Sequence, residues 1–252
     1  MRCFTKVLPV SCCLFFASLL GAPTANAADV SPAASAKATA VERYGDLPLS
    51  FEANQGQTNA QVHFVSRGSG YSFFLTQSGA VLSFSRDAHS DSVLRMQLAG
   101  ANPNARIAGL DELPGKTNYF AGADSSRWRT GVPTYSRVKY ENIYPGIDLL
   151  YHGIGGQLEY DFVVHAGAQP KTIRIRFTGA ERVKLNPRGG LEVEAKSGKL
   201  CFHKPVAYQS DGERKRNVDA HYVLKCKHRV GFVLGAYDWK MPLIIDPVVS
   251  GP

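Results

Sequence analysis

The segment LEYDFVVH, residues 158–165, decides the fold class of this chain. Apolar side chains recur at every second position of this segment, at Leu158, Tyr160, Phe162 and Val164. The positions between them carry Glu159, Asp161, Val163 and His165. A period of two places the two sets on opposite faces of a β-strand. The segment therefore predicts a strand with one buried face and one wet face, a pattern typical of antiparallel sheets.

The same alternation recurs along much of the chain. Short β runs, separated by Gly, Pro, Asn and Asp, are predicted at residues 62–66, 71–76, 80–85, 93–98, 173–177, 183–185, 191–195, 220–226, 230–234 and 243–245. The aromatic-rich residues 119–151 are expected to form irregular strand and turn, and no long amphipathic helix is predicted. Strands at this spacing are typical of sandwiches and barrels. We predict an all-β, antiparallel, β-sandwich-like architecture, with two packed β subdomains divided near residues 166–170 as an alternative.

The N-terminus predicts export. A charged start is followed by an apolar run from Val7 to Leu20, which is shorter than the ~20 residues that a membrane-spanning helix needs. The small residues that follow predict cleavage between Ala27 and Ala28. We therefore expect a signal peptide at 1–27, a flexible leader at 28–46 and an all-β module at 47–249. The mature chain would carry no transmembrane segment and would be secreted, to the periplasm or to the cell exterior.

Two cysteines, Cys201 and Cys226, remain in the predicted mature chain. Because an exported protein meets an oxidising compartment, we predict that they form a disulfide. Such a link would stabilise the fold by roughly 3 kcal/mol in the chain-entropy model. Two unpaired, buried thiols are the alternative. Acylation of Cys12 or Cys13 is disfavoured because both lie inside the apolar run of the signal.

The composition is that of a globular, basic protein. The sequence has 252 residues with a formal net charge of +8, and 44% of them are hydrophobic. That hydrophobic share is ordinary, so a packed core is expected. A basic surface could meet acidic polysaccharide, anionic lipid headgroups or nucleic acid. Because lysines and arginines are spread along the chain, a soluble domain with a modest net charge is the preferred interpretation. We expect an unknown protein or polysaccharide partner and no nucleic acid.

Little in the sequence indicates catalysis. The pairs Glu159/Asp161 and Glu192/Glu194 would each place two carboxylates on one strand face, about 6–7 Å apart by strand rise. Glycoside hydrolases use carboxylates at about 5–9.5 Å, so a hydrolase is one alternative, although any wet strand face produces such pairs. No nucleophile elbow, phosphate-binding loop or dinucleotide-binding fingerprint occurs. We assign no catalytic or cofactor-binding residue and predict that the chain is not an enzyme.

Metal binding is also not predicted. The cysteines and histidines lack the spacing of a zinc site. Calcium is an alternative that would use carboxylates and backbone carbonyls, but no EF-hand or nonapeptide pattern is present. The carboxylates considered for calcium are Asp111, Glu112, Asp148 and Asp246. We therefore assign no metal ligand.

The aromatic residues of the middle section allow two interpretations. They are Tyr119, Phe120, Trp128, Tyr135, Tyr140, Tyr144 and Tyr151. Tyr, Phe and Trp favour strands, so burial in a β core is preferred. Stacking on sugar rings or bases is the alternative, and it motivates a carbohydrate- or cell-wall-binding module as a second hypothesis.

Several ordered motifs resemble a known family. They are LSFEANQGQ (49–57), GYSFFL (70–75), NYFAG (118–122), WRTGVPTY (128–135), VKY (138–140), YPGIDL (144–149), LEYDF (158–162) and IIDP (244–247). Together they resemble the exported bacterial domain of unknown function that typically precedes SBBP, or seven-bladed β-propeller, repeats. The resemblance implies an extracellular β-rich module with no assigned activity and no catalytic residues to carry over.

The sequence thus favours a non-catalytic β-rich module of a secreted or cell-surface bacterial protein, with an adhesion, scaffolding or interaction role. The alternatives are a carbohydrate- or cell-wall-binding module and a glycoside hydrolase-like enzyme. Propeller repeats are expected after the IIDP segment in longer relatives, whereas this sequence ends at Pro252. We therefore expect one of three origins for this sequence: a stand-alone version of the domain, a truncated product, or a fragment of a longer reading frame.

Overall fold

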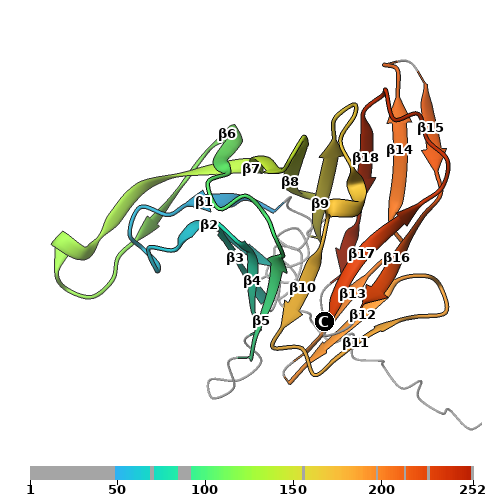
Figure 1. Cartoon of the computed structure of the whole chain (residues 1–252). Coiled ribbons are helices and arrows are strands. Elements are labelled where there is room, and N and C mark those ends of the chain that lie inside the picture. The colour runs from blue at the N-terminus through green and yellow to red at the C-terminus, as the bar shows by residue number, and fades with distance from the viewer. Residues whose placement is uncertain are drawn as a thin grey trace, which may run out of the picture. The chain divides into compact units, whose positions relative to one another are not determined.

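A computed structural model describes residues 49–68, 71–84, 92–154, 157–196, 198–212, 214–225 and 228–250. They form β-strands and two short 3-10 helices, with no α-helix in these ranges, as Figure 1 shows. The predicted all-β class is therefore confirmed. The predicted signal peptide, the cleavage site between Ala27 and Ala28 and the whole flexible leader at 28–46 belong to residues outside these ranges.

The predicted β runs start and end within two residues of observed strands, and the structure adds strands that were not predicted. In chain order they are β1 (Phe51–Ala53), β2 (Val62–Gly68), β3 (Tyr71–Thr76), β4 (Gly79–Phe84), β5 (Ser92–Leu98), β6 (Arg106–Tyr119), β7 (Arg129–Tyr144), β8 (Ile147–Ile154), β9 (Gln157–Val164), β10 (Ile175–Thr178), β11 (Arg182–Leu185), β12 (Leu191–Ala195), β13 (Gly198–Phe202), β14 (Val206–Ser210), β15 (Lys215–Val218), β16 (Ala220–Lys225), β17 (Arg229–Leu234), β18 (Leu243–Asp246) and β19 (Val248–Ser250). The 3-10 helices are η1 (Ser125–Arg127), between β6 and β7, and η2 (Pro170–Thr172), between β9 and β10.

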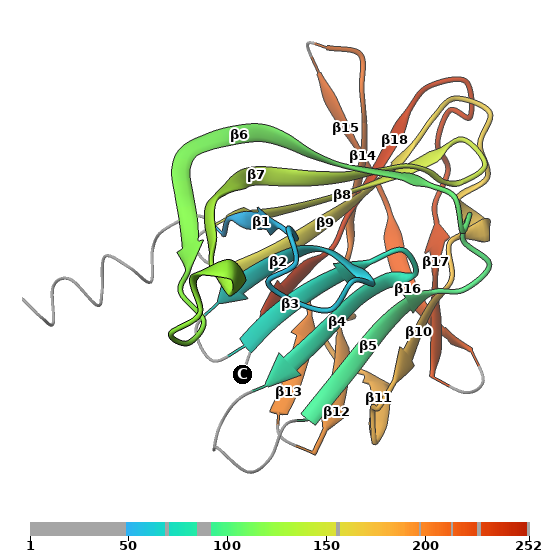
Figure 2. The ribbon, with the colours of Figure 1, turned by 90° about the vertical axis from the view of Figure 1, so that its left-hand side faces the viewer.

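All strand pairs are antiparallel, and they link into two arms that meet at β7. The first arm runs β1, β2, β3, β4, β5, β10, β17 and β16. The second arm runs β8 and β9, then divides into β18, β14 and β15 and into β19, β13, β12 and β11. Figure 2 shows β2–β5 side by side, with β6–β9 crossing above them.

Two forked strands keep the arms in one sheet. Near Tyr135, β7 pairs with β1, and from Arg137 onward the same strand pairs with β8. In the same way, β9 pairs with β19 near Leu158 and with β18 from Phe162 onward. The described strands therefore form one nearly closed, barrel-like sheet, and the predicted sandwich is wrong in this respect. A sandwich needs two separate sheets, and the forks prevent that separation.

One core lies between the two arms. The ring centroids of Phe162 on β9 and Phe232 on β17 are 5.9 Å apart, and those of Phe177 on β10 and Phe202 on β13 are 5.3 Å apart. The apolar set of 158–164 is at most 2% exposed, as its alternation predicts. Burial of each such side chain contributes about 1.5–3 kcal/mol. Because the core includes residues on both sides of 166–170, packing is continuous across that turn.

The middle section is more regular than the sequence predicts. In place of irregular strand and turn, β6 and β7 form a long hairpin of 14 and 16 residues. Its register shifts between Glu112 and Lys116, which brackets Pro114 and Gly115. Bulges of this kind absorb residues that cannot continue a regular ladder. Asp111 and Asn142 adopt φ values of 53° and 49°, which mark the irregular points.

Candidate functional site

Asn54 closes the loop that follows β1. Its Oδ1 accepts hydrogen bonds from the backbone N–H of Gly56 at 3.0 Å and of Thr58 at 3.3 Å. Its Nδ2 donates to the backbone oxygens of Asn59 at 2.9 Å and Val62 at 2.8 Å. An Asn side chain that bonds its own backbone two residues on is a common turn device. Gly56, at a φ of 97°, supplies the left-handed residue that the turn needs.

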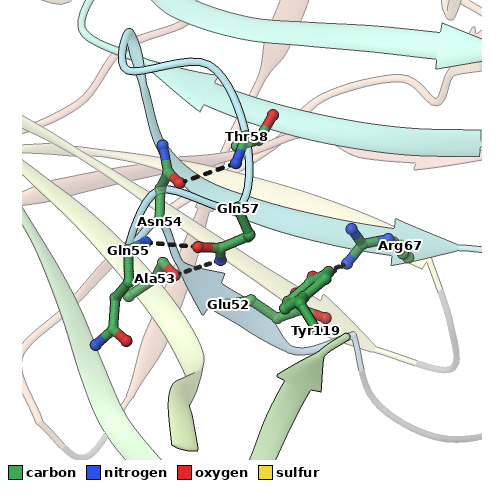
Figure 3. A network of polar contacts seen from close by, with 8 residues as sticks. All are labelled: Glu52, Ala53, Asn54, Gln55, Gln57, Thr58, Arg67 and Tyr119. Carbon is green, nitrogen blue, oxygen red and sulfur yellow. Dashed lines mark hydrogen bonds and ion pairs between the residues drawn. The ribbon is translucent and has the colours of Figure 1, made fainter. Parts of the chain in front are cut away.

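Gln57 locks the same loop from the other side. Its Oε1 accepts from the N–H of Gln55 at 2.6 Å, and its Nε2 donates to the oxygen of Ala53 at 2.7 Å, as Figure 3 shows. The FEANQGQ motif therefore builds a self-contained loop. The amide side chains of Asn54 and Gln57 bond the backbone, so these two are structural residues.

A polar triad joins this loop to the end of β6 (Figure 3). Arg67 Nη1 donates to Glu52 Oε2 at 2.8 Å and to the Tyr119 hydroxyl at 2.7 Å. The Tyr119 hydroxyl also donates to Glu52 Oε2. Burial raises the pKa of Tyr119, and the hydrogen bond to Glu52 adds to the rise. The three side chains come from β1, β2 and β6, so they fix the last residue of β6 against the edge of the first arm.

Arg129 makes the second connection. Its Nε donates to the backbone oxygen of Gln55 at 3.1 Å. Its Nη1 donates to the oxygens of Ser126 at 3.1 Å and Trp128 at 2.9 Å. The turn is also capped by Asp124, whose Oδ1 accepts from the N–H of Ser126 at 3.0 Å. One guanidinium therefore ties the turn between β6 and β7 to the FEANQGQ loop.

Two large apolar side chains project from this anchored turn. Phe120 is 63% exposed and Trp128 is 39% exposed. Their rings pack edge to face with centroids 5.1 Å apart, a favourable aromatic geometry. Trp128 Nε1 donates to the oxygen of Gly122 at 3.0 Å, which fixes the indole. We call Tyr119, Phe120 and Trp128 the aromatic end.

The aromatic end shows how the predicted aromatic set divides. Tyr140, Tyr144 and Tyr151 are at most 2% exposed and belong to the core, as the preferred interpretation predicts. Phe120 and Trp128 instead face solvent, as the stacking alternative requires. Sequence alone could not separate the two groups, because both lie in the same aromatic-rich section, residues 119–151.

Comparison with known proteins places the chain in a family. A family model described as "Domain of unknown function (DUF7948)" matches residues 51–248. The chain belongs to this family. The match covers the residues that carry the sequence resemblance except Leu49 and Ser50, but it includes nothing about propeller repeats or export. Searches of curated proteins and of solved structures each found no match.

An acidic cluster lies on the wet face of β9 in this DUF7948 domain. Asp161 Oδ2 is 3.1 Å from His152 Nε2, and Glu159 Oε2 is 3.7 Å from His152 Nδ1. All three side chains are at most 17% exposed. Burial, followed by the charges of Asp161 and Glu159, raises the pKa of Asp246 to about 6. The predicted pair Glu159/Asp161 is thus joined by a histidine from β8 and a third carboxylate from β18.

The closeness of three carboxylates and one histidine affects the protonation of Asp246 and His152. The hydrogen bond to Asp161 raises the pKa of His152. The Oδ1 atoms of Asp161 and Asp246 are both buried without a hydrogen-bond partner in the described region. A proton on Asp246 would supply the donor that two carboxylates lack. Neither His152 nor Asp246 could be added to the pair from sequence, because strand pairing brings them there.

The second predicted carboxylate pair is neutralised by lysines. Lys184 Nζ lies 3.2 Å from Glu192 and 3.0 Å from Glu194. Lys199 Nζ lies 2.8 Å from Glu192. These opposite charges come from the strands on either side of β12. Glu192 and Glu194 therefore form ordinary cross-strand ion pairs.

The carboxylates considered for calcium do not meet. Asp148 accepts from the N–H of Asn142 at 2.8 Å and contacts Lys139 at 3.1 Å and His165 at 3.0 Å. Burial alone would raise its pKa, but these partners lower it. Asp111 pairs with Arg137, and Glu112 pairs with Lys116. Among the described side chains, no group of three or more His, Cys, Asp or Glu could hold a metal ion.

The predicted disulfide is only half covered by the structure. Cys201, on β13, carries a free thiol, and no disulfide is seen among the described residues. Its predicted partner Cys226 lies outside the described residues, so the pairing stays a prediction.

In the described part of the chain, no helix is long and apolar enough to cross a membrane.

Proposed function

We propose that this chain is a non-catalytic interaction module of a secreted or cell-surface bacterial protein, and that it binds a partner protein through the aromatic end. The observation that carries the proposal is the exposure of the Phe120–Trp128 pair on a fully anchored turn. Burial of such side chains against a partner contributes about 1.5–3 kcal/mol each. Trp, Tyr and Arg are also the residue types enriched at interface hot spots, and Arg67 and Arg129 flank the pair.

The hydrogen bonds that anchor the turn between β6 and β7 are better explained by partner binding than by a need of the core. The triad and Arg129 hold the turn in place from β1, β2 and the FEANQGQ loop. A partner would therefore meet a preorganised surface and would lose little conformational entropy on binding. Nothing in the folding of the core requires Phe120 to stay 63% exposed.

Photo-crosslinking tests this function. A photo-crosslinking residue replaces Phe120 in the chain expressed in its own bacterium, and crosslinked proteins are identified by mass spectrometry. Leu185, which is 44% exposed on β11, is the matched control position. We expect a defined adduct from position 120 that disappears when Trp128→Ser is added. An adduct that forms equally from position 185, or that survives Trp128→Ser, would contradict the proposal.

Export and a place beside propeller repeats belong to the same proposal. The predicted signal at 1–27 supports export, and the motif resemblance supports the association with repeats. N-terminal sequencing of the protein from its native host tests the first point. A mature chain that starts at Ala28 is expected, and one that starts at Met1 would refute export by this signal.

Glycoside hydrolysis is a second candidate, favoured by one observation. Asp246, with a pKa raised to about 6, lies near the carboxylates of Asp161 and Glu159. A protonated acid beside an ionised carboxylate is the arrangement that glycosidases use. The test is release of reducing ends from envelope polysaccharides by the purified chain and by Asp246→Asn. Release that is unchanged in the variant, or absent from both, removes this candidate.

A further inference from the structure

The lining of a pocket of about 510 Å³ includes no residue of the aromatic end or of the acidic cluster. It is formed by the turn at 167–171, the end of β17 and the loop that follows it. Phe232, Tyr237 and Trp239 provide its aromatic lining, and Gln169 and Lys171 provide polar groups. None of its described lining residues is acidic. Nothing in the sequence pattern had pointed to this loop.

Trp239 is held in an exposed position by a buried amide. Gln209, on β14, is 2% exposed. Its Oε1 accepts from the N–H of Asp238 at 2.9 Å, and its Nε2 donates to the oxygens of Asp238 at 2.7 Å and Met241 at 3.2 Å. The oxygen of Trp239 accepts from the N–H of Gly167 at 2.8 Å. The backbone on both sides of Trp239 is thus fixed, while the side chain is 62% exposed.

Two lysines and one glutamine, Gln169, provide polar side chains in and beside this pocket. Lys240 Nζ lies 5.7 Å from the centroid of the Trp239 ring. Neither Lys171 nor Lys240 has a carboxylate partner in the described part of the chain. The side chain of Gln169 makes no capping hydrogen bond to η2. A ligand in the pocket would therefore meet the Trp239 ring, the Lys171 ammonium group and the Gln169 amide, which can both donate and accept. The Lys240 ammonium group lies over the Trp239 ring, outside the residues that line the pocket.

We propose that this pocket binds an acidic saccharide, a uronic acid unit of a polysaccharide. The C–H face of the sugar ring packs on Trp239, its carboxylate pairs with Lys171 and Lys240, and Gln169 bonds its hydroxyls. The charge of the pocket selects an acidic sugar over a neutral one. The Trp239 indole is 62% exposed and offers a flat apolar face on which a sugar ring can pack.

The two tryptophans of the chain, Trp128 and Trp239, make the test direct. In Trp128→Phe, Trp239 is the only fluorescent indole, and this protein is titrated with tri-galacturonate and with neutral maltotriose. We expect a saturable change with tri-galacturonate and binding at least about tenfold weaker for maltotriose. Lys171→Gln should weaken tri-galacturonate binding about fivefold and reduce its salt dependence. Lys196→Gln, an exposed lysine elsewhere, is the control.

Calorimetry with Trp239→Ala completes the test, because that variant has lost the reporter. Thermal melting confirms that each variant is folded. Loss of measurable heat is expected for Trp239→Ala. Equal affinity for the two trisaccharides, retained binding in Trp239→Ala, or preference for an apolar peptide would each overturn the inference. Because the aromatic end is a different surface, failure here leaves the proposed protein interaction standing, and crosslinking at position 120 tests that separately.

Discussion

The two exposed tryptophans, Trp128 and Trp239, are held in place by different kinds of hydrogen bonds. Trp128 uses its indole N–H inside its own turn, and its turn is tied down by exposed or half-buried groups such as Arg67 and Arg129. Trp239 has no hydrogen bond from its indole among the described residues, and one buried amide, Gln209, fixes its loop. Exposed ion pairs are individually weak, whereas loss of a buried amide leaves backbone groups unpaired. Single substitutions among the groups that anchor the aromatic end should therefore change the free energy of unfolding little, whereas substitution of Gln209 should lower it strongly.

Gln209→Leu should give the largest effect. The change leaves the N–H of Asp238 and the oxygen of Met241 without their partner, while the oxygen of Asp238 still accepts from the N–H of Met241 at 3.1 Å. We expect the free energy of unfolding to fall by about 3 kcal/mol, as measured by urea denaturation. Gln61→Leu, at an exposed position, is the control and should change it by less than about 0.5 kcal/mol. Equal effects of the two changes would break the comparison.

Asn54→Ala should be second. It removes four hydrogen bonds that close the FEANQGQ loop. Since water replaces part of them, we expect a loss of about 1.5 kcal/mol. Hydrogen exchange should show faster exchange at Gly56 and Thr58 and unchanged protection in β9. Uniform loss of protection would mean that this loop is coupled to the core after all.

Asp246→Asn tests a half-buried charge, which is intermediate between the buried amide of Gln209 and the exposed ion pair of Arg67. The folded-state pKa of Asp246 is about 6 and its ordinary value is 3.8, so the folded chain holds a proton more tightly. Stability is therefore greatest at acidic pH and falls as pH rises through about 6. His152, with its raised pKa, acts in the same direction.

The variant removes this penalty. At pH 8 we expect Asp246→Asn to be more stable than the unmodified chain by about 1 kcal/mol, after allowance for solvent screening. At pH 4 the two proteins should melt together. Melting curves across this pH range decide the point, and a constant difference at all pH values would show that Asp246 does not titrate as described.

Arg67→Ala should give the smallest effect on stability. Arg67 is 47% exposed at its side chain, so its ion pair with Glu52 contributes about 0.5 kcal/mol or less. The loss should shrink further in high salt. Crosslinking from position 120 should nevertheless weaken, because Tyr119 loses one of its anchors. A loss of several kcal/mol would contradict the distinction between the two tryptophan sites.

Much of the fold was predictable because strand burial is a local property. The alternation in 158–164 predicts both the strand β9 and its buried face, and the predicted runs at 183–185 and 191–195 correspond to β11 and β12. The hairpin of β6 and β7 was missed because Pro114 and the bulge residues interrupt its alternation. The sandwich was wrong because forked pairing at β7 and β9 depends on partners far along the chain.

The sites divide in the same way. Residue types by themselves identified Glu159 and Asp161 as neighbours and marked Phe120 and Trp128 as aromatic candidates, since these statements need only spacing and composition. Only the tertiary structure joined Asp246 and His152 to the acids, exposed Phe120 while burying Tyr151, and placed Gln209 under the Trp239 loop. These outcomes depend on contacts between segments that strand pairing brings together, and no local pattern in a single sequence records such contacts.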